Sequence, residues 1–386
     1  MLKCQMLPCF VLFALLSTPS LASTEYVLVN NNNSVANSAI LYRLNRASGY
    51  LRKVSVLATG GLGVGAVGGD FSGVQEVESP GTPCVFILDT GSSDIAAFSS
   101  SSGYKRVGSY FDQNLISGAE GDSITLSPDS QFLYASYTRT GNVGAWKVNS
   151  DCSLEFITKS GSLTGVGPLE VTPNGKYLLA RGGGGVTEFA IDKLTGNLTE
   201  IGITSFRTGA CQRESACLPY GIQITRDSKV AIFAGWAPDA RQERLIPLML
   251  TARITPTGLM YPTVRDLTIE NDLRLNDFPF LSAAGYEGNG PIYLGATSGN
   301  GQYNPGVLTA DFTERPLKFA VTNSTIANPQ VGNIAVTGNV MVIAQYPNQI
   351  GVFRIQKDGS LKLLSTTTID EQGEGLFSLS IFPNTR

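Results

Sequence analysis

The chain contains no histidine, so proton transfer near neutral pH would fall to other groups. Asp, Glu, Lys or Tyr with a shifted pKa, or a metal-bound water, would have to act as general acid and base. A cationic candidate for binding an anion is Arg181, which is followed directly by glycines 182–185. This run lacks the Gly-Lys-Ser/Thr ending and the helix of a phosphate-binding P-loop. We interpret it as a wide turn between two strands, with Arg181 placed to bind an anion where the first strand ends.

Residues 86–93, FILDTGSS, resemble the active-site signature of aspartic proteases. That chemistry needs two carboxylates that share a proton, and the chain has no second Asp-Thr-Gly or Asp-Ser-Gly. Similarly, Gly63, Gly65 and Gly68 satisfy a G-x-G-x-x-G pattern, but no helical pattern follows them. Asp89 falls where the other copies of the repeat described below place the loop between their second and third strands. We therefore interpret it as a loop residue and the glycine-rich segment as a flexible connection, not as catalytic or dinucleotide-binding sites.

These segments belong to a weak internal repeat, most clearly visible in residues 123–147. The unit reads as an apolar strand, a Pro-Asp-Ser turn, an alternating strand, a polar loop and a third strand. Its turn recurs at Pro80, Pro128, Pro173, Arg226, Gly338 and Pro383, with steps of 48, 45, 53, 112 and 45 residues. The step of 112 corresponds to two units, the second of which we place at residues 280–317. This repeat length is typical of the four-stranded blades of a β-propeller.

The two ends of the repeat region complement each other. Residues 377–384, FSLSIFPN, match a first strand and turn, and residues 25–31, EYVLVNN, match a second strand that lacks a first. Ring closure would leave no free sheet edge. The sequence therefore predicts an all-β, seven-bladed β-propeller whose first blade is closed by the C-terminal strand, in a single domain covering residues 23–386.

Residues 1–22 have the pattern of a secretory signal peptide. Lys3 precedes an apolar run that is too short to span a bilayer, and Ser20-Leu21-Ala22 fits a cleavage site. We expect a secreted or periplasmic monomer without a transmembrane anchor after cleavage. Only 15% of the residues are charged and the net charge is −3, so we expect no nucleic-acid partner.

Export would leave four cysteines in the mature chain, an even number in an oxidising compartment. Cys211 and Cys217 enclose five residues and form the obvious local pair. Cys84 and Cys152 fall in turns on the same face of neighbouring blades, so a bridge between blades is geometrically possible. The alternative is that these two are buried free thiols.

The repeats resemble those of the lactonase-type seven-bladed propellers, described as 6-phosphogluconolactonase-like or carboxymuconate-cyclase-like. The resemblance rests on SPDSQFLYASY in the third blade, VTPNGKYLLARG in the fourth, the turn AIDKLTGNL and the closing FSLSIFPN. It implies lactone hydrolysis at the central funnel, where active members commonly carry histidine. The matching positions here are Asp122, Leu169, Tyr220, Phe280 and Gln330.

Two functions follow as hypotheses. In the first, Arg181 stabilises the oxyanion of a sugar lactone or related cyclic ester, and Asp122, Glu371 or Glu374 activates water. Tyr220, Phe280 and Gln330 would contact the ligand. In the second, the propeller binds a small molecule or a protein at the funnel face without catalysis. We expect no cofactor, and no metal-ligand set can be assembled from spacing.

Overall fold

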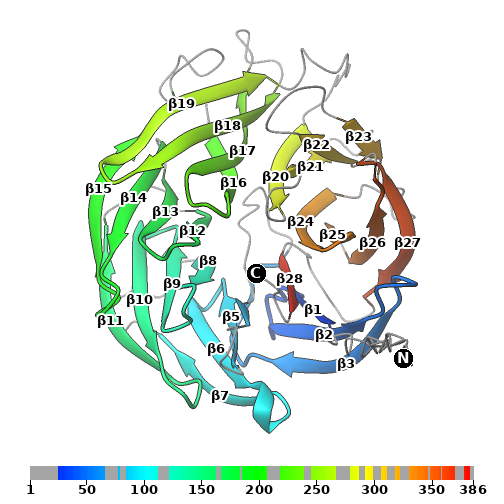
Figure 1. The fold of residues 1–386 in the computed structure, drawn as a ribbon. Helices are drawn as coiled ribbons and strands as arrows, with labels where there is room; N and C mark the ends of the chain where they lie inside the picture. Colours follow the sequence, from blue (N-terminus) through cyan, green and yellow to red (C-terminus); the bar gives the residue numbers. More distant parts are fainter. Residues whose placement is uncertain are drawn as a thin grey trace, which may run out of the picture.

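The structure of the protein is a computed structural model. It describes residues 25–65, 77–78, 84–111, 121–161, 167–182, 185–206, 218–238, 245–266, 279–286, 292–298, 306–310, 318–321, 330–346, 348–357, 359–369 and 378–382. Within these residues the strands form seven four-stranded sheets arranged in a ring (Figure 1). The described residues contain one short 3₁₀ helix, η1 (Ser100–Ser102), and no helix long and apolar enough to cross a bilayer.

We number the sheets in chain order and give their strands from the centre of the ring outward. The first sheet contains β28 (Ser378–Phe382), β1 (Glu25–Asn30), β2 (Ser38–Leu44) and β3 (Leu51–Ala58). The second contains β4 (Val77–Glu78), β5 (Cys84–Asp89), β6 (Asp94–Ser99) and β7 (Lys105–Tyr110). The third contains β8 (Gly121–Leu126), β9 (Phe132–Tyr137), β10 (Asn142–Val148) and β11 (Leu154–Ser160). The fourth contains β12 (Leu169–Val171), β13 (Tyr177–Gly182), β14 (Gly185–Ile191) and β15 (Leu198–Thr204).

The remaining sheets follow the same order. The fifth contains β16 (Leu218–Ile224), β17 (Val230–Pro238), β18 (Leu245–Thr255) and β19 (Gly258–Asp266). The sixth contains β20 (Pro279–Tyr286), β21 (Ile292–Ser298), β22 (Gly306–Ala310) and β23 (Lys318–Val321). The seventh contains β24 (Gln330–Thr337), β25 (Val340–Tyr346), β26 (Gln349–Ile355) and β27 (Leu361–Thr368).

Burial explains why the strands differ in composition across a sheet. All six residues of β5, CVFILD, and of β9, FLYASY, are buried because neighbouring sheets cover both faces. Continuous apolar runs are typical of strands covered on both sides. The outermost strands β3 and β7 are largely exposed and carry charged residues. The core is therefore a series of contacts between sheets, such as the apolar cluster that joins the second sheet to the third.

The turns between first and second strands explain the recurrent sequence signal. Ser130, Gly175, Ser228 and Gly338 have φ values of 61°, 66°, 59° and 57°. This left-handed conformation favours glycine and short polar residues over β-branched ones. The repeated Asp-Ser, Asn-Gly and Thr-Gly dipeptides thus mark the same backbone position in successive sheets.

Ring closure occurs as the sequence predicted. The C-terminal strand β28 pairs antiparallel with β1, with Tyr26 opposite Phe382 and Asn30 opposite Ser378. The seam with the seventh sheet is held by Glu25, whose Oε1 accepts bonds from Arg46 Nη1 at 3.2 Å and from Thr337 Oγ1 at 3.0 Å. The all-β propeller and its closure by the chain's last strand are confirmed.

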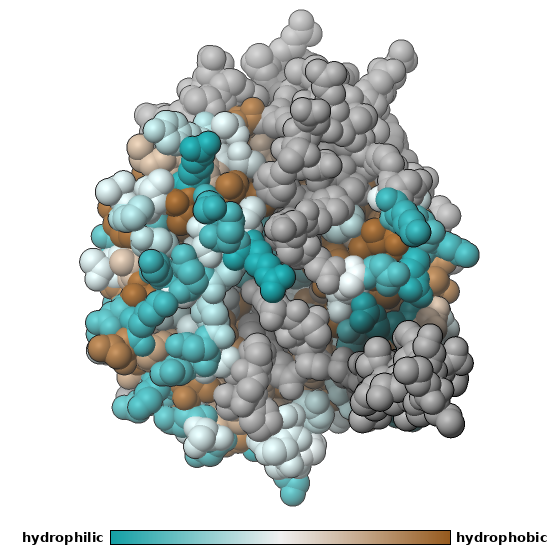
Figure 2. All heavy atoms as spheres, viewed as in Figure 1, coloured by the Kyte–Doolittle hydropathy of each residue, from teal (hydrophilic) through white to brown (hydrophobic). Residues whose placement is uncertain are grey.

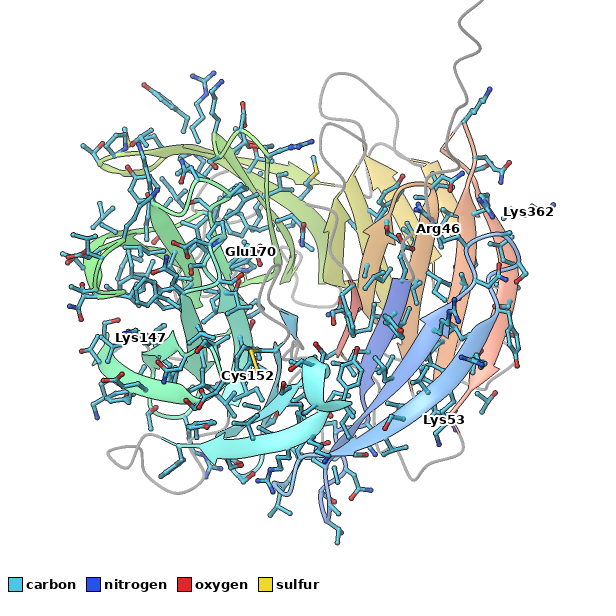
Figure 3. The ribbon with its side chains drawn as sticks, turned by 60° about the horizontal axis from the view of Figure 1, so that its bottom comes forward. Arg46, Lys53, Lys147, Cys152, Glu170 and Lys362 are labelled. Carbon is cyan, nitrogen blue, oxygen red and sulfur yellow. A yellow bond between two sulfur atoms is a disulfide. The ribbon has the colours of Figure 1, made fainter. Side chains whose placement is uncertain are left out.

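The disulfide between Cys84 and Cys152 is also confirmed, with the two Cα atoms 5.4 Å apart. It joins the start of β5 to the turn between β10 and β11, and so links the second sheet to the third (Figure 3). The alternative of two free thiols is therefore wrong. Cys211 and Cys217 lie outside the described residues.

The boundaries differ from the predicted ones in two places. The sixth sheet extends from Pro279 to Val321, beyond the predicted residues 280–317, because its outermost strand is β23. Strand β5 ends at Asp89, so this residue, which we predicted in the loop between second and third strands, belongs to the second strand. Residues 1–22, the predicted signal peptide, lie outside the described residues.

Candidate functional site

The candidate residues lie at one end of the strands. Because neighbouring strands are antiparallel, the loops between second and third strands share an end with the connections between sheets. Arg181 lies near the end of second strand β13, and Asp122 lies at the start of innermost strand β8. We call this end of the ring the upper face. Both predicted residues therefore belong to it.

Asp122 occupies an irregular position in the sheet. The register between β8 and β9 shifts between Gly121 and Ser123, so Asp122 is the extra residue of a β-bulge. Bulges redirect a side chain and are frequent beside active sites. The Asp122 side chain is buried, and its Oδ2 accepts a hydrogen bond from Thr138 Oγ1 at 3.2 Å. The bulge and Thr138 together fix one oxygen of the carboxylate.

Arg181 is fixed by the connection that precedes the fourth sheet. The Arg181 N–H donates to the Pro168 carbonyl, and the Gly167 N–H donates to the Arg181 carbonyl, each at 3.0 Å. A Cβ atom placed on Gly167 would lie 2.7 Å from both Cδ and Nη1 of Arg181 and 3.1 Å from Oδ2 of Asp122. The guanidinium and the carboxylate therefore approach the same point, although 59 positions separate them in the sequence.

This pairing gives the site a cation and an anion in fixed positions. A guanidinium can stabilise negative charge that develops on a carbonyl oxygen, and a carboxylate can accept a proton from water. Sequence reasoning named both residues, but it did not predict the role of Gly167. The close approach is possible only because Gly167 has no side chain.

A second carboxyl group, Asp89, lies next to this site. The Gly121 N–H donates to the Thr90 carbonyl at 3.2 Å, which joins the end of β5 to the strand that carries Asp122. Asp89 is fully buried, and Asn37 Nδ2 donates to its Oδ1 at 2.6 Å. Burial, together with the charge of Asp94, raises the pKa of Asp89 to about 7, although hydrogen bonds from Thr59 and Asn37 and the charge of Arg106 act to lower it.

Asp89 and Asp94 do not form the proton-sharing pair of an aspartic protease. Asp94 accepts hydrogen bonds from the hydroxyl groups of Ser92 and Ser109, whereas Asp89 is bound by Asn37. Each carboxyl therefore has its own donors. Asp89 connects the first and second sheets and is the last residue of β5, where it pairs with Asp94, the first residue of β6.

The glycine-rich segment after the first sheet is also structural where it is described. The N–H groups of Gly63 and Gly65 donate to the carbonyls of Asn33 and Asn32 at 2.7 and 3.0 Å. No helix begins at these glycines within the described residues. The segment packs against the loop between β1 and β2, as expected for a connection between sheets.

The other predicted ligand-binding residues are described only by their backbone. Tyr220 is the extra residue of a bulge in β16, as Asp122 is in β8. Phe280 pairs with Thr297 in β20, and Gln330 pairs with Tyr346 in β24. All three thus lie in innermost strands. Glu371 and Glu374 lie outside the described residues.

Leu169, the remaining position suggested by the family resemblance, does not contribute a polar group. It is 1% exposed and packs in the apolar cluster between the third and fourth sheets. Its N–H donates to Ser123 Oγ at 3.4 Å, which links the innermost strands β12 and β8. Leu169 therefore helps to hold β8, the strand that carries Asp122, against the fourth sheet.

Sequence reasoning did not single out Glu188, a carboxyl group buried between the fourth and fifth sheets. It is 1% exposed, and neither carboxylate oxygen has a hydrogen-bond partner among the described residues. It lies opposite Leu179 on β13 and Gly202 on β15. Burial raises the pKa of Glu188 to about 7. The acidic residue within the otherwise apolar third strand, GVTEFAI, was the available signal.

Among the described residues, no three His, Cys, Asp or Glu side chains group together in a way that could hold a metal ion. In the view of Figure 2, the described surface mixes hydrophilic and hydrophobic residues without a wide continuous apolar area. The chemistry that the described site offers is therefore that of Asp122, Arg181 and Thr138.

The comparisons with known proteins establish the fold. No protein-family model matches the sequence, and no curated protein matches it. A solved structure of a proposed 6-phosphogluconolactonase from Bacteroides fragilis is 16% identical, with a TM-score of 0.64 over 94% of this chain and 99% of that one. A second proposed 6-phosphogluconolactonase, from Bacteroides uniformis, is 13% identical, with a TM-score of 0.65 over 93% and 99%.

A protein from Lactobacillus plantarum is 14% identical, with a TM-score of 0.65 over 93% of this chain and 99% of that one. At these identities, similarity of structure shows the fold and leaves the activity to be argued from the site. The chain is thus similar, over nearly its whole length, to β-propellers of which two are proposed 6-phosphogluconolactonases.

Proposed function

We propose that the chain is an exported, seven-bladed lactonase-like propeller that hydrolyses a sugar lactone or related cyclic ester at the upper face. The observation that carries this proposal is the convergence of Asp122 and Arg181 on Gly167. The similarity in fold to proposed lactonases supports the same reaction class. We further propose a secreted or periplasmic monomer that acts without a cofactor.

In the proposed reaction, Arg181 binds the lactone carbonyl oxygen and stabilises the negative charge of the tetrahedral intermediate. Asp122 accepts a proton from the attacking water, and Thr138 holds the carboxylate in place. The new C–O bond forms from water to the carbonyl carbon. The ring C–O bond then breaks, and the leaving alkoxide takes the proton from Asp122. The product is an open-chain hydroxy acid.

The test is the hydrolysis of a panel of aldonolactones by the purified protein. Turnover is measured as the acid that hydrolysis releases. We expect Arg181→Ala to lower kcat/KM by about 10²–10³, because it removes an oxyanion-stabilising group. Asp122→Asn should lower kcat by about 10²–10⁴, because it removes the general base. Matched controls are Arg226→Ala and Asp227→Asn, in the exposed turn between β16 and β17 at the opposite end of the strands.

Unchanged turnover in both site variants would overturn the assignment of these residues and direct attention to Glu371 and Glu374. Absence of turnover on every lactone, with and without added divalent metal, would overturn the proposed hydrolase activity.

A specific observation supports the alternative, a non-catalytic ligand-binding propeller: Asp122 is only 1% exposed, which limits the access of water. Lactone or aldonate binding that is lost in Arg181→Ala, without turnover, would establish that alternative.

A further inference from the structure

Positive charge is concentrated on one part of the outer wall of the ring. The outermost strands β27, β3 and β7 belong to three consecutive sheets and follow one another along the rim (Figure 1). They carry five exposed cationic side chains and no acidic residue. We call this set the cationic band: Arg52, Lys53, Lys105, Arg106 and Lys362.

Among the other described outer strands, β11, β15 and β19 contain Glu155, Glu200 and Asp266, respectively. Strand β23 of the sixth sheet carries Lys318 and no acidic residue. The whole chain has a net charge of −3. The band is therefore a local excess of positive charge on an otherwise acidic protein.

The register of the strands shows that this excess is unfavourable for the sheets themselves. Arg43 on β2 lies directly opposite Arg52 on β3, and Arg354 on β26 lies directly opposite Lys362 on β27. Like charges directly opposite each other across antiparallel strands are destabilising. Two such pairs occur in adjacent sheets. Residues that oppose the local stability of a fold are frequently retained for function.

Several cations of this region are bound within the structure, including Arg106 of the band, whose Nη2 donates to Ser109 Oγ at 2.8 Å. Arg46 binds Glu25 and the Thr337 carbonyl, and Arg354 Nη1 donates to Asn339 Oδ1 at 3.2 Å. In contrast, no hydrogen bond or ion pair to another described residue is found for the side chains of Arg52 and Lys362. Figure 3 shows Lys53 and Lys362 on the outer strands, on the same side of the ring as Arg46.

We propose that the cationic band binds a linear anionic polysaccharide, a chain of sugars that carry carboxylate or sulfate groups. A single exposed ion pair contributes little free energy, so a small monovalent anion would not be retained. A polymer that contacts several cations at once gains from multivalency. The band follows the convex rim across three sheets, which suits a flexible chain better than a flat membrane.

A polysaccharide also fits the side chains of the band better than a single-stranded nucleic acid does. Proteins that bind single-stranded nucleic acid combine cations with aromatic platforms on which bases stack. The three outer strands expose aliphatic residues, among them Val54, Val107 and Leu363. The exposed aromatic residues next to them, Tyr50 and Phe111, lie just outside strands β3 and β7. This proposal is independent of the upper-face site.

The test uses the full mature protein and polygalacturonate as the probe, with neutral pullulan as the reference polymer. Binding is measured at about 50 mM and about 300 mM NaCl, because screening by salt weakens exposed ion pairs. We expect binding to polygalacturonate at low salt that weakens at high salt. The double variant Lys53→Glu/Lys362→Glu should bind at least about tenfold more weakly.

The matched control is Lys159→Glu/Lys176→Glu, which changes the net charge equally at exposed lysines of the third and fourth sheets. It should change binding by less than about twofold. If the first double variant does not fold, Arg52→Gln/Lys105→Gln replaces it. Equal losses in the band and control variants would overturn the proposal, as would absence of binding at low salt. Preference for oligothymidylate or for vesicles containing phosphatidylglycerol over polygalacturonate would also overturn it.

Discussion

At the scale of single residues, Gly167 is the most sensitive position of the proposed site. Adding a methyl group there would place an atom within 2.7 Å of Arg181 and 3.1 Å of Asp122. We expect Gly167→Ala to displace the guanidinium and to lower lactone turnover by about tenfold or more, since small misplacements of catalytic groups cost large factors in rate. The matched control is Gly202→Ala, because a Cβ atom at Gly202 would meet nothing within 4 Å. Equal activity in both variants would show that lactone turnover does not depend on the present position of Arg181.

Glu188 gives a prediction about pH at the same scale. Its pKa is raised by burial from 4.5 to about 7, so the folded protein holds a proton that the unfolded chain has lost. The stability that this proton provides is fully present below pH 4.5 and is lost as the pH rises through about 7. We expect Glu188→Gln to remove this loss and to raise the free energy of unfolding at pH 8, relative to wild type, by about 1–3 kcal/mol more than at pH 4.5. Denaturant unfolding at both pH values checks this. Exposed Glu200→Gln is the control, and a difference that does not depend on pH would contradict the prediction.

At the scale of strands and sheets, the disulfide is the strongest local link between neighbours. Cys84 and Cys152 tie the second sheet to the third and close a loop of 68 residues. We expect the double variant Cys84→Ala/Cys152→Ala to lose about 2–5 kcal/mol of unfolding free energy, because the bridge restricts the unfolded chain. Reductant should destabilise the wild type by a similar amount. As a control, the effect of the same reductant on the unfolding free energy of the double variant measures any contribution of the remaining cysteines. Equal stability of the wild type and the double variant would contradict the prediction.

The elements also show what the sequence could and could not reveal. The turns were predictable because a left-handed residue, such as Ser130 or Gly175, has a distinct sequence preference. The bulge at Asp122 was not, because an extra residue in a strand becomes visible only when the partner strand is known. The meeting of Asp122 and Arg181 likewise depends on packing between two sheets. Burial of Asp89 and Glu188 arises in the same way, from residues that are distant in sequence.

At the scale of the whole molecule, stability depends on closing the ring. Strand β28 completes the first sheet and pairs with β1 over five residues. Without it, β1 would present an unpaired edge, and apolar residues such as Leu379 and Ile381 would no longer cover the seam with the seventh sheet. Exposed edge strands promote association between chains. The final strand is therefore expected to determine whether the ring is monomeric and soluble.

Deletion of residues 378–386 tests this dependence. We expect the truncated chain to unfold at lower denaturant concentration and to aggregate, as judged by light scattering, because it loses one of four strands and gains a free edge. The matched control deletes residues 383–386, which follow β28, and should behave as wild type. Adding a synthetic peptide with the sequence of residues 376–384 should restore solubility, since strand addition at an open edge supplies the missing backbone hydrogen bonds. A truncated chain as stable and soluble as the control would show that the remaining strands hold the ring without closure, and the prediction would fail.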